Sequence, residues 1–220
     1  MESLLAWGSA LILVLSTPAF RANTSPTIIL SNNVPVRLNE DTAYIRVVTE
    51  RAGKIVAALK LPDSASFYRV RGVVAGQYEA LNVVYSERDD RLKQLKEQQP
   101  APVKTVEDSA RKRIEEDVDA KVARLHEAYL AKLATELNPQ QVDEIKDGMT
   151  YHVVEVTYHA YLERLPQLTD EQKARIMADL IEAREHAMDA ESSKAKHAWF
   201  GKYKGRINNY LSSQGLEMKK

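Results

Sequence analysis

Apolar side chains recur at steps of three and four over most of the chain after residue 40, which is the spacing of one face of an α-helix. The first such stripe predicts a helix over about residues 40–59. The second predicts a helix that Asp63 caps and that continues to Glu97. The third predicts a helix that Thr105 caps and that runs to about Leu133. The pattern therefore predicts an all-α protein.

The second and third predicted helices are separated by Gln98–Pro102, which contains two prolines and is typical of a turn. Two long helices joined by a short connection pack antiparallel. We therefore expect a long helical hairpin over residues 63–137. Its many Lys, Arg, Glu and Asp side chains indicate an arm that is surrounded by solvent.

Shorter segments make up residues 138–220. Asn138 with Gln141 and Thr169 with Gln172 each fit a capping box, in which a cap residue is followed three positions later by Glu or Gln. These motifs predict helices at about residues 139–148 and 170–189, and a last helix follows at 193–213.

One segment of this part, Tyr151–Leu165, is ambiguous because its Val, Thr and Tyr side chains would also suit a strand. We interpret it as a helix that Thr150 starts, because capped helices flank it. The predicted fold class is thus an all-α helical bundle of at least five helices, with a long antiparallel helical hairpin and a C-terminal cluster of shorter helices.

The N-terminus predicts export. Residues 4–15 are mostly apolar, and Thr17 and Ala19 suit the small positions of a signal peptidase site, although the leader carries Glu2 and no Lys or Arg. The apolar run is too short to cross a bilayer. We expect residues 1–19 to be a signal peptide, 20–38 an extended lead-in and 39–220 a single helical domain. The mature protein would be secreted or periplasmic and not transmembrane.

Charge and composition exclude several kinds of partner and catalytic site. The 31 basic and 31 acidic residues cancel, so no overall field favours nucleic acid, and none is expected as a partner. There is no cysteine, which excludes a thiolate nucleophile and Cys-ligated metal. Common catalytic and phosphate-binding motifs are absent as well. No cofactor is predicted.

His152, Glu155, His159 and Glu163 are the first candidate cluster. At steps of three and four they would share one helix face, where two imidazoles and two carboxylates could converge on a metal ion. The favoured interpretation is ordinary surface pairs, because no further ligands are evident. We therefore predict no metal site.

Residues 192–210 form the second candidate cluster, with five cationic side chains, no acid and several aromatic rings. Trp199, Tyr203, Ile207 and Tyr210 make one stripe, which we expect to be core. The predicted ligand-binding residues are His197, Trp199, Lys202, Lys204, Arg206, Asn208 and Asn209. Such donors beside aromatic rings suit sugar hydroxyls and especially uronate carboxylates, which Arg can bind through two hydrogen bonds.

Two pairs of glycines spaced four apart, Gly72 with Gly76 and Gly201 with Gly205, lie within predicted helices. Glycine costs about 1 kcal/mol in a helix interior, so each pair calls for a reason. We expect close helix–helix packing, with close approach of a ligand as the alternative.

The C-terminal stretch resembles a known family. The resemblance rests on Ala187–Ala190, Ser192–Ser193, Lys196–His197 and Phe200–Leu211, and extends from about Asp41 to the C-terminus. The family is an uncharacterised group of exported bacterial proteins, a domain of unknown function described as sugar-binding. It has no established catalytic residues to carry over. Leu168–Gln172 and Leu137–Gln141 also resemble elements of small periplasmic helical stress proteins that act as chaperones or metal sensors.

Three functions follow as hypotheses. The leading one is an exported, non-enzymatic carbohydrate-binding protein, with acidic polysaccharide fragments as possible ligands. The second is a periplasmic helical chaperone or stress adaptor that holds protein partners with the charged hairpin. The third is a glycan-active enzyme in which His152, His159 or His197 is the acid or base, and Lys202 or Arg206 stabilises charge.

Overall fold

The computed structural model describes residues 34–98 and 103–216, with side chains from residue 42 onward. Within these ranges the chain forms seven α-helices and no strand, which confirms the all-α prediction. In chain order the helices are α1 (Val34–Ala57), α2 (Ser64–Glu97), α3 (Lys104–Ala134), α4 (Pro139–Met149), α5 (Val153–Arg164), α6 (Asp170–Met188) and α7 (Ser193–Ser213). The predicted signal peptide, residues 1–19, lies outside the described residues.

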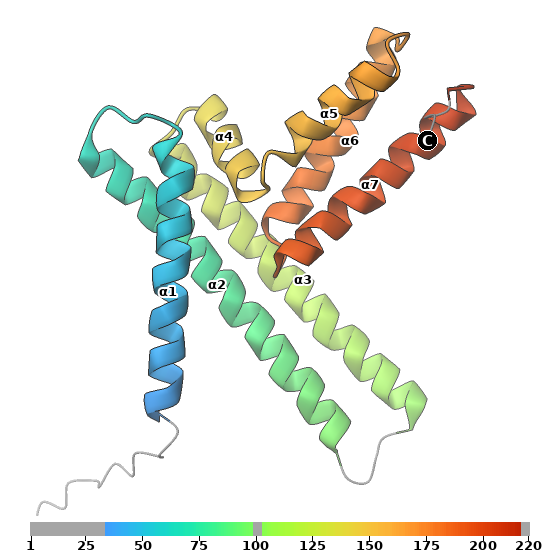
Figure 1. Ribbon diagram of the computed structural model, residues 1–220. Helices are drawn as coiled ribbons and strands as arrows, with labels where there is room; N and C mark the ends of the chain where they lie inside the picture. The colour runs from blue at the N-terminus through green and yellow to red at the C-terminus, as the bar shows by residue number, and fades with distance from the viewer. Residues whose placement is uncertain (1–33, 99–102, 217–220) are drawn as a thin grey trace, which may run out of the picture.

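The long antiparallel pair is α2 and α3, as predicted, and it forms the longest part of the molecule (Figure 1). Helix α1 packs on α2, and α4 contacts both α1 and α3. Helices α5, α6 and α7 form a second group, in which α6 packs against both neighbours. The two groups meet where α6 contacts α4.

Local caps start three of these helices as expected. The Asp63 carboxylate accepts a hydrogen bond from the Ser66 backbone N–H at 2.8 Å. Asn138 and Thr169 each form a complete capping box with the Gln three residues later. The prediction for Thr105 was wrong: Val103 is the N-cap residue of α3 and makes no side-chain cap. Thr105 is already helical, and its carbonyl accepts from the Ser109 hydroxyl.

Two other boundaries differ from the prediction. Helix α1 begins at Val34, so residues 34–38 are helical and do not belong to an extended lead-in, while residues 20–33 lie outside the described ranges. Thr150 closes α4 instead of starting the next helix, because its hydroxyl donates to the Lys146 carbonyl at 2.8 Å. Tyr151 and His152 then adopt left-handed backbone angles, and the ambiguous segment continues as helix α5.

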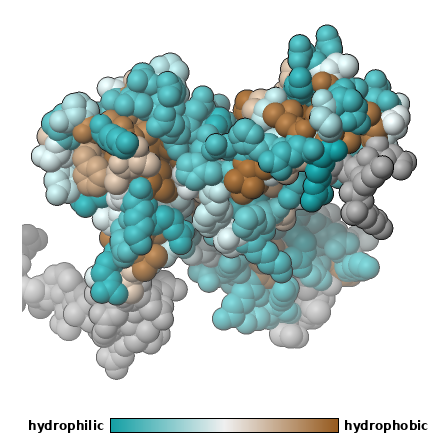
Figure 2. Space-filling model, turned by 45° about the horizontal axis from the view of Figure 1, so that its top comes forward, coloured by the Kyte–Doolittle hydropathy of each residue, from teal (hydrophilic) through white to brown (hydrophobic). Residues whose placement is uncertain are grey.

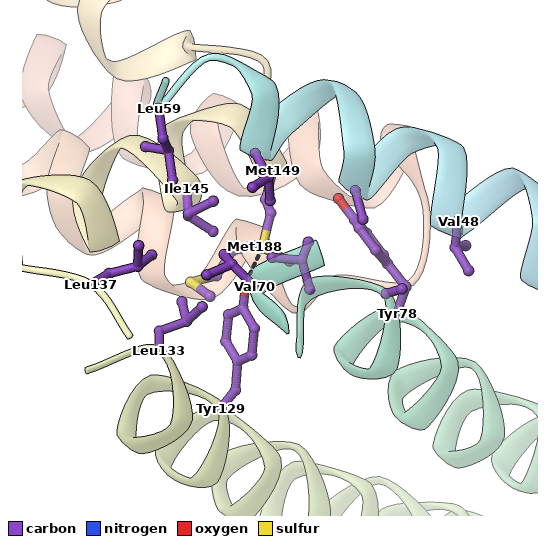
Figure 3. Close-up of a cluster of buried hydrophobic side chains, with 14 residues drawn as sticks. Val48, Leu59, Val70, Tyr78, Tyr129, Leu133, Leu137, Ile145, Met149 and Met188 are labelled. Carbon is purple, nitrogen blue, oxygen red and sulfur yellow. Dashed lines mark hydrogen bonds between the residues drawn. The ribbon is translucent and has the colours of Figure 1, made fainter. Parts of the chain in front are cut away.

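The buried apolar side chains fall into two clusters. The first joins α1, α2, α3 and α4, with Val70, Leu133 and Ile145 among its fully buried members (Figure 3). The second joins α5, α6 and α7 around Leu180 and Ile207. Helix α6 belongs to both, because its last residue, Met188, packs in the first cluster.

The predicted core stripe of α7 is partly correct. Tyr203 and Ile207 are buried, whereas Trp199 and Tyr210 are only half-buried. Phe200 occupies the buried position next to Trp199 instead. None of the helices in the described ranges has both the length and the apolar character needed to cross a membrane.

Candidate functional site

A cleft of about 550 Å³ lies between the α2–α3 hairpin and the α6–α7 pair. Its walls come from four helices that are distant in sequence. The lining residues are Tyr85 and Arg88 of α2; Glu115, Val118, Asp119, Val122, Ala123, His126 and Glu127 of α3; Glu185 and His186 of α6, with Asp189 just after it; and Trp199 of α7.

His126 is the most distinctive group of the cleft. Its Nδ1 lies 2.6 Å from Asp189 Oδ2, and the Asp189 carboxylate is almost fully buried. The other oxygen of Asp189 accepts from the Gln77 amide at 2.9 Å, which fixes the carboxylate in place. The hydrogen bond that His126 donates to Asp189 raises the pKa of His126, against the opposing effect of its partial burial. Asp189 therefore orients the imidazole and favours its protonated form.

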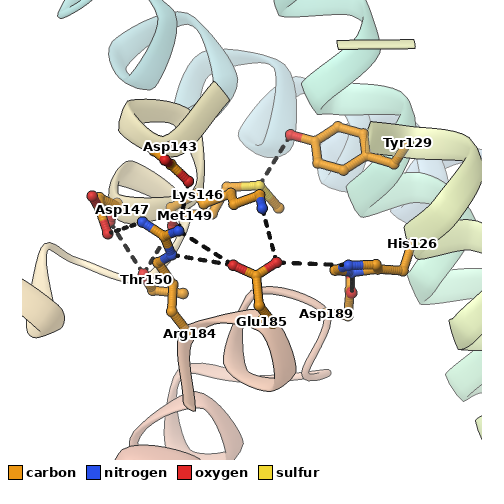
Figure 4. A network of polar contacts seen from close by, with 10 residues as sticks. All are labelled: His126, Tyr129, Asp143, Lys146, Asp147, Met149, Thr150, Arg184, Glu185 and Asp189. Carbon is orange, nitrogen blue, oxygen red and sulfur yellow. Dashed lines mark hydrogen bonds and ion pairs between the residues drawn. The ribbon is translucent and has the colours of Figure 1, made fainter. Parts of the chain in front are cut away.

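Glu185 lies on the other side of the same imidazole. Its Oε2 is 3.7 Å from His126 Nε2, too far for a hydrogen bond, and accepts from the Lys146 ammonium at 2.9 Å (Figure 4). Arg184 contacts the second oxygen of Glu185. Nε2 of His126 has no hydrogen-bond partner among the described residues, so it remains available to a molecule in the cleft.

An aromatic wall closes the α7 side. The rings of Trp199 and His186 stack with centroids 4.4 Å apart and planes inclined by 15°. The Lys202 ammonium lies 4.8 Å from the centroid of the Trp199 ring. On the opposite side, the Tyr85 hydroxyl donates to the Asp189 carbonyl at 2.9 Å. The cleft thus has an aromatic wall beside polar groups, a combination that is typical of small-molecule sites.

The charge of the lining is mainly negative. Glu115, Asp119 and Glu127 are exposed and form no ion pair with the described part of the chain. Arg88, the one arginine in the lining, is already paired with Asp89 and Glu191. This arrangement favours ligands that donate hydrogen bonds over ligands that carry a negative charge.

The sequence from residue 45 to residue 220 matches the family model described as protein of unknown function (DUF3826). The chain belongs to the DUF3826 family. The match includes every residue that lines the cleft. Among curated proteins, none matches this chain in sequence.

Two of the predicted ligand-binding residues lie at the cleft or its rim, and a third lies outside it. Trp199 lines the cleft and Lys202 covers its ring. His197 is exposed and stacks on Tyr151 with centroids 5.6 Å apart, outside the cleft lining.

The other four predicted ligand-binding residues are dispersed over α7. The Arg206 guanidinium pairs with Asp179 and Glu182 of α6. Asn208 accepts a hydrogen bond from the Tyr161 hydroxyl of α5 at 2.8 Å. Lys204 and Asn209 are exposed. Residues 192–210 contain no acid, but acidic side chains of α6 neutralise part of their positive charge. The seven predicted residues do not share one site.

The two glycine pairs do not mark close helix packing, which corrects the expectation. A methyl group added at Gly72, Gly76, Gly201 or Gly205 would meet no atom within 4 Å. Gly72 and Gly76 instead border a shallow groove of about 500 Å³ between α2 and α3. The glycine that does pack closely is Gly148, where an added methyl group would lie 2.8 Å from Ile55 Cγ2.

The His152–Glu163 cluster does not converge. His152 lies before α5 in a left-handed conformation, so it does not continue the face of Glu155, His159 and Glu163, and all four side chains are exposed. In the described ranges no group of three or more His, Cys, Asp or Glu side chains could hold a metal ion.

Sequence reasoning missed the centre of the cleft. His126, Glu185 and Asp189 match no motif, because the residues that meet are 59 and 63 positions apart. One signal was present, since Asp189 belongs to the Ala187–Ala190 segment that carries the family resemblance. Nothing in the spacing pointed to His126 as its partner.

The outer surface adds one constraint. The face that Figure 2 brings forward is largely hydrophilic, and its hydrophobic residues form separate patches. Large continuous apolar patches often mark protein-binding surfaces, and this face shows none. The chaperone hypothesis, which places protein partners on the charged hairpin, stays a prediction.

Proposed function

We propose that the protein binds carbohydrate in the cleft between the hairpin and the α6–α7 pair. The observation that carries the proposal is the Trp199 ring, stacked on His186 in the wall of a cleft that also presents unpaired carboxylates. Apolar C–H groups of a sugar can pack against the exposed part of this aromatic wall, where Trp199 is half-buried. Sugar hydroxyls would donate to Asp119 and Glu127, which lack cationic partners in the described residues.

The expected ligand is a neutral sugar and not a uronate. The predicted uronate partner Arg206 is engaged by two carboxylates, and the cleft itself carries an excess of acids. A carboxylate on the ligand would be repelled by Glu115 and Asp119. The sugar-binding description of the resembling family supports the same ligand class.

Binding should be tested by calorimetry with neutral oligosaccharides and their uronate counterparts. Trp199→Ala should weaken binding of a neutral ligand at least tenfold, which corresponds to about 1.4 kcal/mol. Tyr151→Ala is the matched control, because Tyr151 is an exposed aromatic residue stacked on His197 away from the cleft lining. Asp119→Asn and Glu127→Gln change exposed side chains and should weaken binding without unfolding the protein.

Two results would contradict the proposal: stronger binding of uronates than of neutral sugars, or equal losses in the Trp199 and Tyr151 variants. If Trp199→Ala does not fold, the two carboxylate variants decide the question.

We also propose that the protein is exported. The support is the apolar run at residues 4–15 followed by Thr17 and Ala19. Protein recovered outside the cytoplasm should begin near Phe20 on N-terminal sequencing. Recovery from the cytosol alone, with Met1 intact, would contradict export.

A further inference from the structure

The His126–Asp189 pair has the geometry of a proton-transfer group. Asp189 holds Nδ1 of the imidazole at 2.6 Å from the buried side, and Gln77 in turn holds Asp189. Nε2 points away from this support and has no hydrogen bond with the described residues. An imidazole that is fixed by a hydrogen bond on one nitrogen and has no hydrogen bond on the other is suited to general acid–base catalysis.

A second proton-transfer group lies next to it. Glu185 Oε2 is 3.7 Å from His126 Nε2, and both residues line the cleft (Figure 4). Lys146 donates to the same Oε2 and Arg184 contacts Oε1, so the position of the Glu185 carboxylate is fixed as well. An acid and a base this close together can reach two oxygens that are bonded to one carbon.

The anomeric carbon of a reducing sugar carries such a pair of oxygens, the ring oxygen and the anomeric hydroxyl. We propose that His126 and Glu185 catalyse ring opening and closure of a reducing sugar, and so interconvert its α and β anomers. Asp189 is a positioning residue in this scheme. The inference rests on the proposed sugar-binding function and names its substrate class as free aldoses.

The step needs no other reactant. The anomeric O–H gives its proton to the Glu185 carboxylate, while His126 Nε2–H gives its proton to the ring oxygen. The bond between the anomeric carbon and the ring oxygen breaks, and a carbonyl forms. After rotation about the adjacent C–C bond the same transfers run in reverse and close the ring on the other face of the carbonyl. Both side chains return to their starting protonation states.

Hydrolysis of a glycosidic bond makes a different demand. It uses two carboxyl groups that flank the bond, so that one protonates the leaving oxygen while the other acts from the opposite face of the sugar. His126 of α3 and Glu185 of α6 instead lie 3.7 Å apart, where the two walls of the cleft meet, and do not flank a bond from opposite faces. Anomer interconversion needs only this one adjacent pair.

The test measures anomer exchange for the full protein with α-D-glucose, α-D-galactose, α-D-mannose and α-D-xylose, by polarimetry and by NMR exchange spectroscopy. At least one sugar should equilibrate faster than in buffer. His126→Gln and Glu185→Gln should each lower the catalysed rate by about 10²- to 10⁴-fold, the usual contribution of a general acid or base. His159→Gln changes an exposed histidine of α5 outside the cleft lining and should leave the rate unchanged.

The Asp189→Asn variant tests whether Asp189 positions the His126 imidazole or only supports the fold. Loss of this carboxylate should move the high-pH side of the rate profile to lower pH, because the proton on His126 is held less strongly. A merely structural role would lower the rate without moving the profile. If His126→Gln fails to fold, Glu185→Gln decides, because its side chain is 29% exposed and the amide can still bond to Lys146.

Methyl glycosides separate this inference from the proposed function, because they can bind but have no anomeric hydroxyl to deprotonate. Binding of methyl glycosides with no acceleration for any of the four aldoses overturns the catalytic inference and leaves sugar binding intact. Acceleration that survives His126→Gln also overturns it. Absence of binding to both aldoses and glycosides overturns the two together.

Discussion

At the scale of single residues, the most unusual group is Lys196, which is almost fully buried in α7. Its ammonium donates to the Met188 carbonyl at 2.6 Å, at the end of α6, and lies 5.8 Å from the centroid of the Tyr78 ring. The last carbonyls of a helix lack intrahelical partners, so a lysine there satisfies one of them. Burial nevertheless lowers the pKa of Lys196 to about 8, although Asp189 acts in the opposite direction.

This lowered pKa predicts a pH-dependent stability. The unfolded lysine binds its proton up to a pKa near 10.5, whereas the folded one releases it near 8. Between these values the unfolded state binds more protons, so the free energy of unfolding rises with pH. Relative to Lys196→Met, the wild-type protein should gain about 3 kcal/mol over this window and show no such change below pH 8. Urea unfolding at a series of pH values measures the difference.

Lys194→Met is the control for that experiment, because Lys194 is exposed on the same helix. Tyrosines also titrate above pH 8, but they are present in all three proteins and cancel in the comparison. If the free energy of unfolding of the wild-type protein changes with pH in the same way as that of Lys196→Met from pH 7 to 11, the prediction of a buried ammonium with a lowered pKa is wrong.

At the scale of elements, the contact between α1 and α4 depends on one glycine. A methyl group at Gly148 would lie 2.8 Å from Ile55 Cγ2 and 3.3 Å from its Cγ1. Ile55 is branched at Cβ and therefore cannot swing aside easily. Gly148 lets α4 approach α1 closely at this point.

Substitutions at two glycines should accordingly have opposite signs. Gly148→Ala should lower the free energy of unfolding by about 1–3 kcal/mol, the usual cost of overpacking. Gly76→Ala should raise it by about 0.5–1 kcal/mol, because the site is exposed within α2 and alanine is the better helix former. Chemical denaturation of both variants provides the measurement. Destabilisation by Gly76→Ala would mean that the groove beside it is closed more tightly than the structure shows.

The elements themselves were largely predictable, and the reason is local. A stripe with helical spacing, or a cap residue with its partner three positions later, acts within one turn, as Asn138 and Thr169 demonstrate. The errors at Thr105 and Thr150 have the same origin. A threonine hydroxyl can bond backward to a carbonyl as well as forward to an N–H, and at Thr150 it bonds backward.

At the scale of the whole molecule, polar contacts connect the two apolar clusters. Arg184 of α6 donates to Asp147 at 3.0 Å and to Asp143 at 2.6 Å, both in α4. Lys146 of α4 reaches Glu185 of α6. The candidate site lies at the same junction, since Asp189 and His126 come from its two sides.

This position explains why the site was less predictable than the fold. His126 and Asp189 come into hydrogen-bonding distance only when α3 packs near the end of α6. No local sequence pattern predicts that these two helices lie together. The basic stretch of residues 192–210 was predicted to form a single ligand-binding site, because its charge was judged from the sequence alone. It has no acid of its own, but Asp179 and Glu182 lie on the helix that packs against it. Charge balance along the sequence is thus a poor guide to charge balance in space.

The polar contacts at this junction predict that the two apolar clusters unfold together. The Arg184 side chain is only 6% exposed, and Arg184→Ala would leave three carboxylates without it, two of them largely covered. Removing one partner of such a network costs about 3 kcal/mol. The loss falls between the clusters, so α5–α7 should become able to unfold separately. Hydrogen exchange in a urea series should show a common unfolding transition in the wild-type protein and two transitions in Arg184→Ala.

Arg69→Ala is the matched control for this prediction. Arg69 also pairs with a carboxylate, that of Glu136, but its side chain is 54% exposed and both residues belong to the hairpin half of the molecule. An exposed pair contributes about 0–1 kcal/mol, so this variant should keep a single transition at slightly lower urea. If Arg184→Ala also keeps a single transition, the continuity of α6 through Met188 into the first cluster, and not the polar junction, is what couples the two halves.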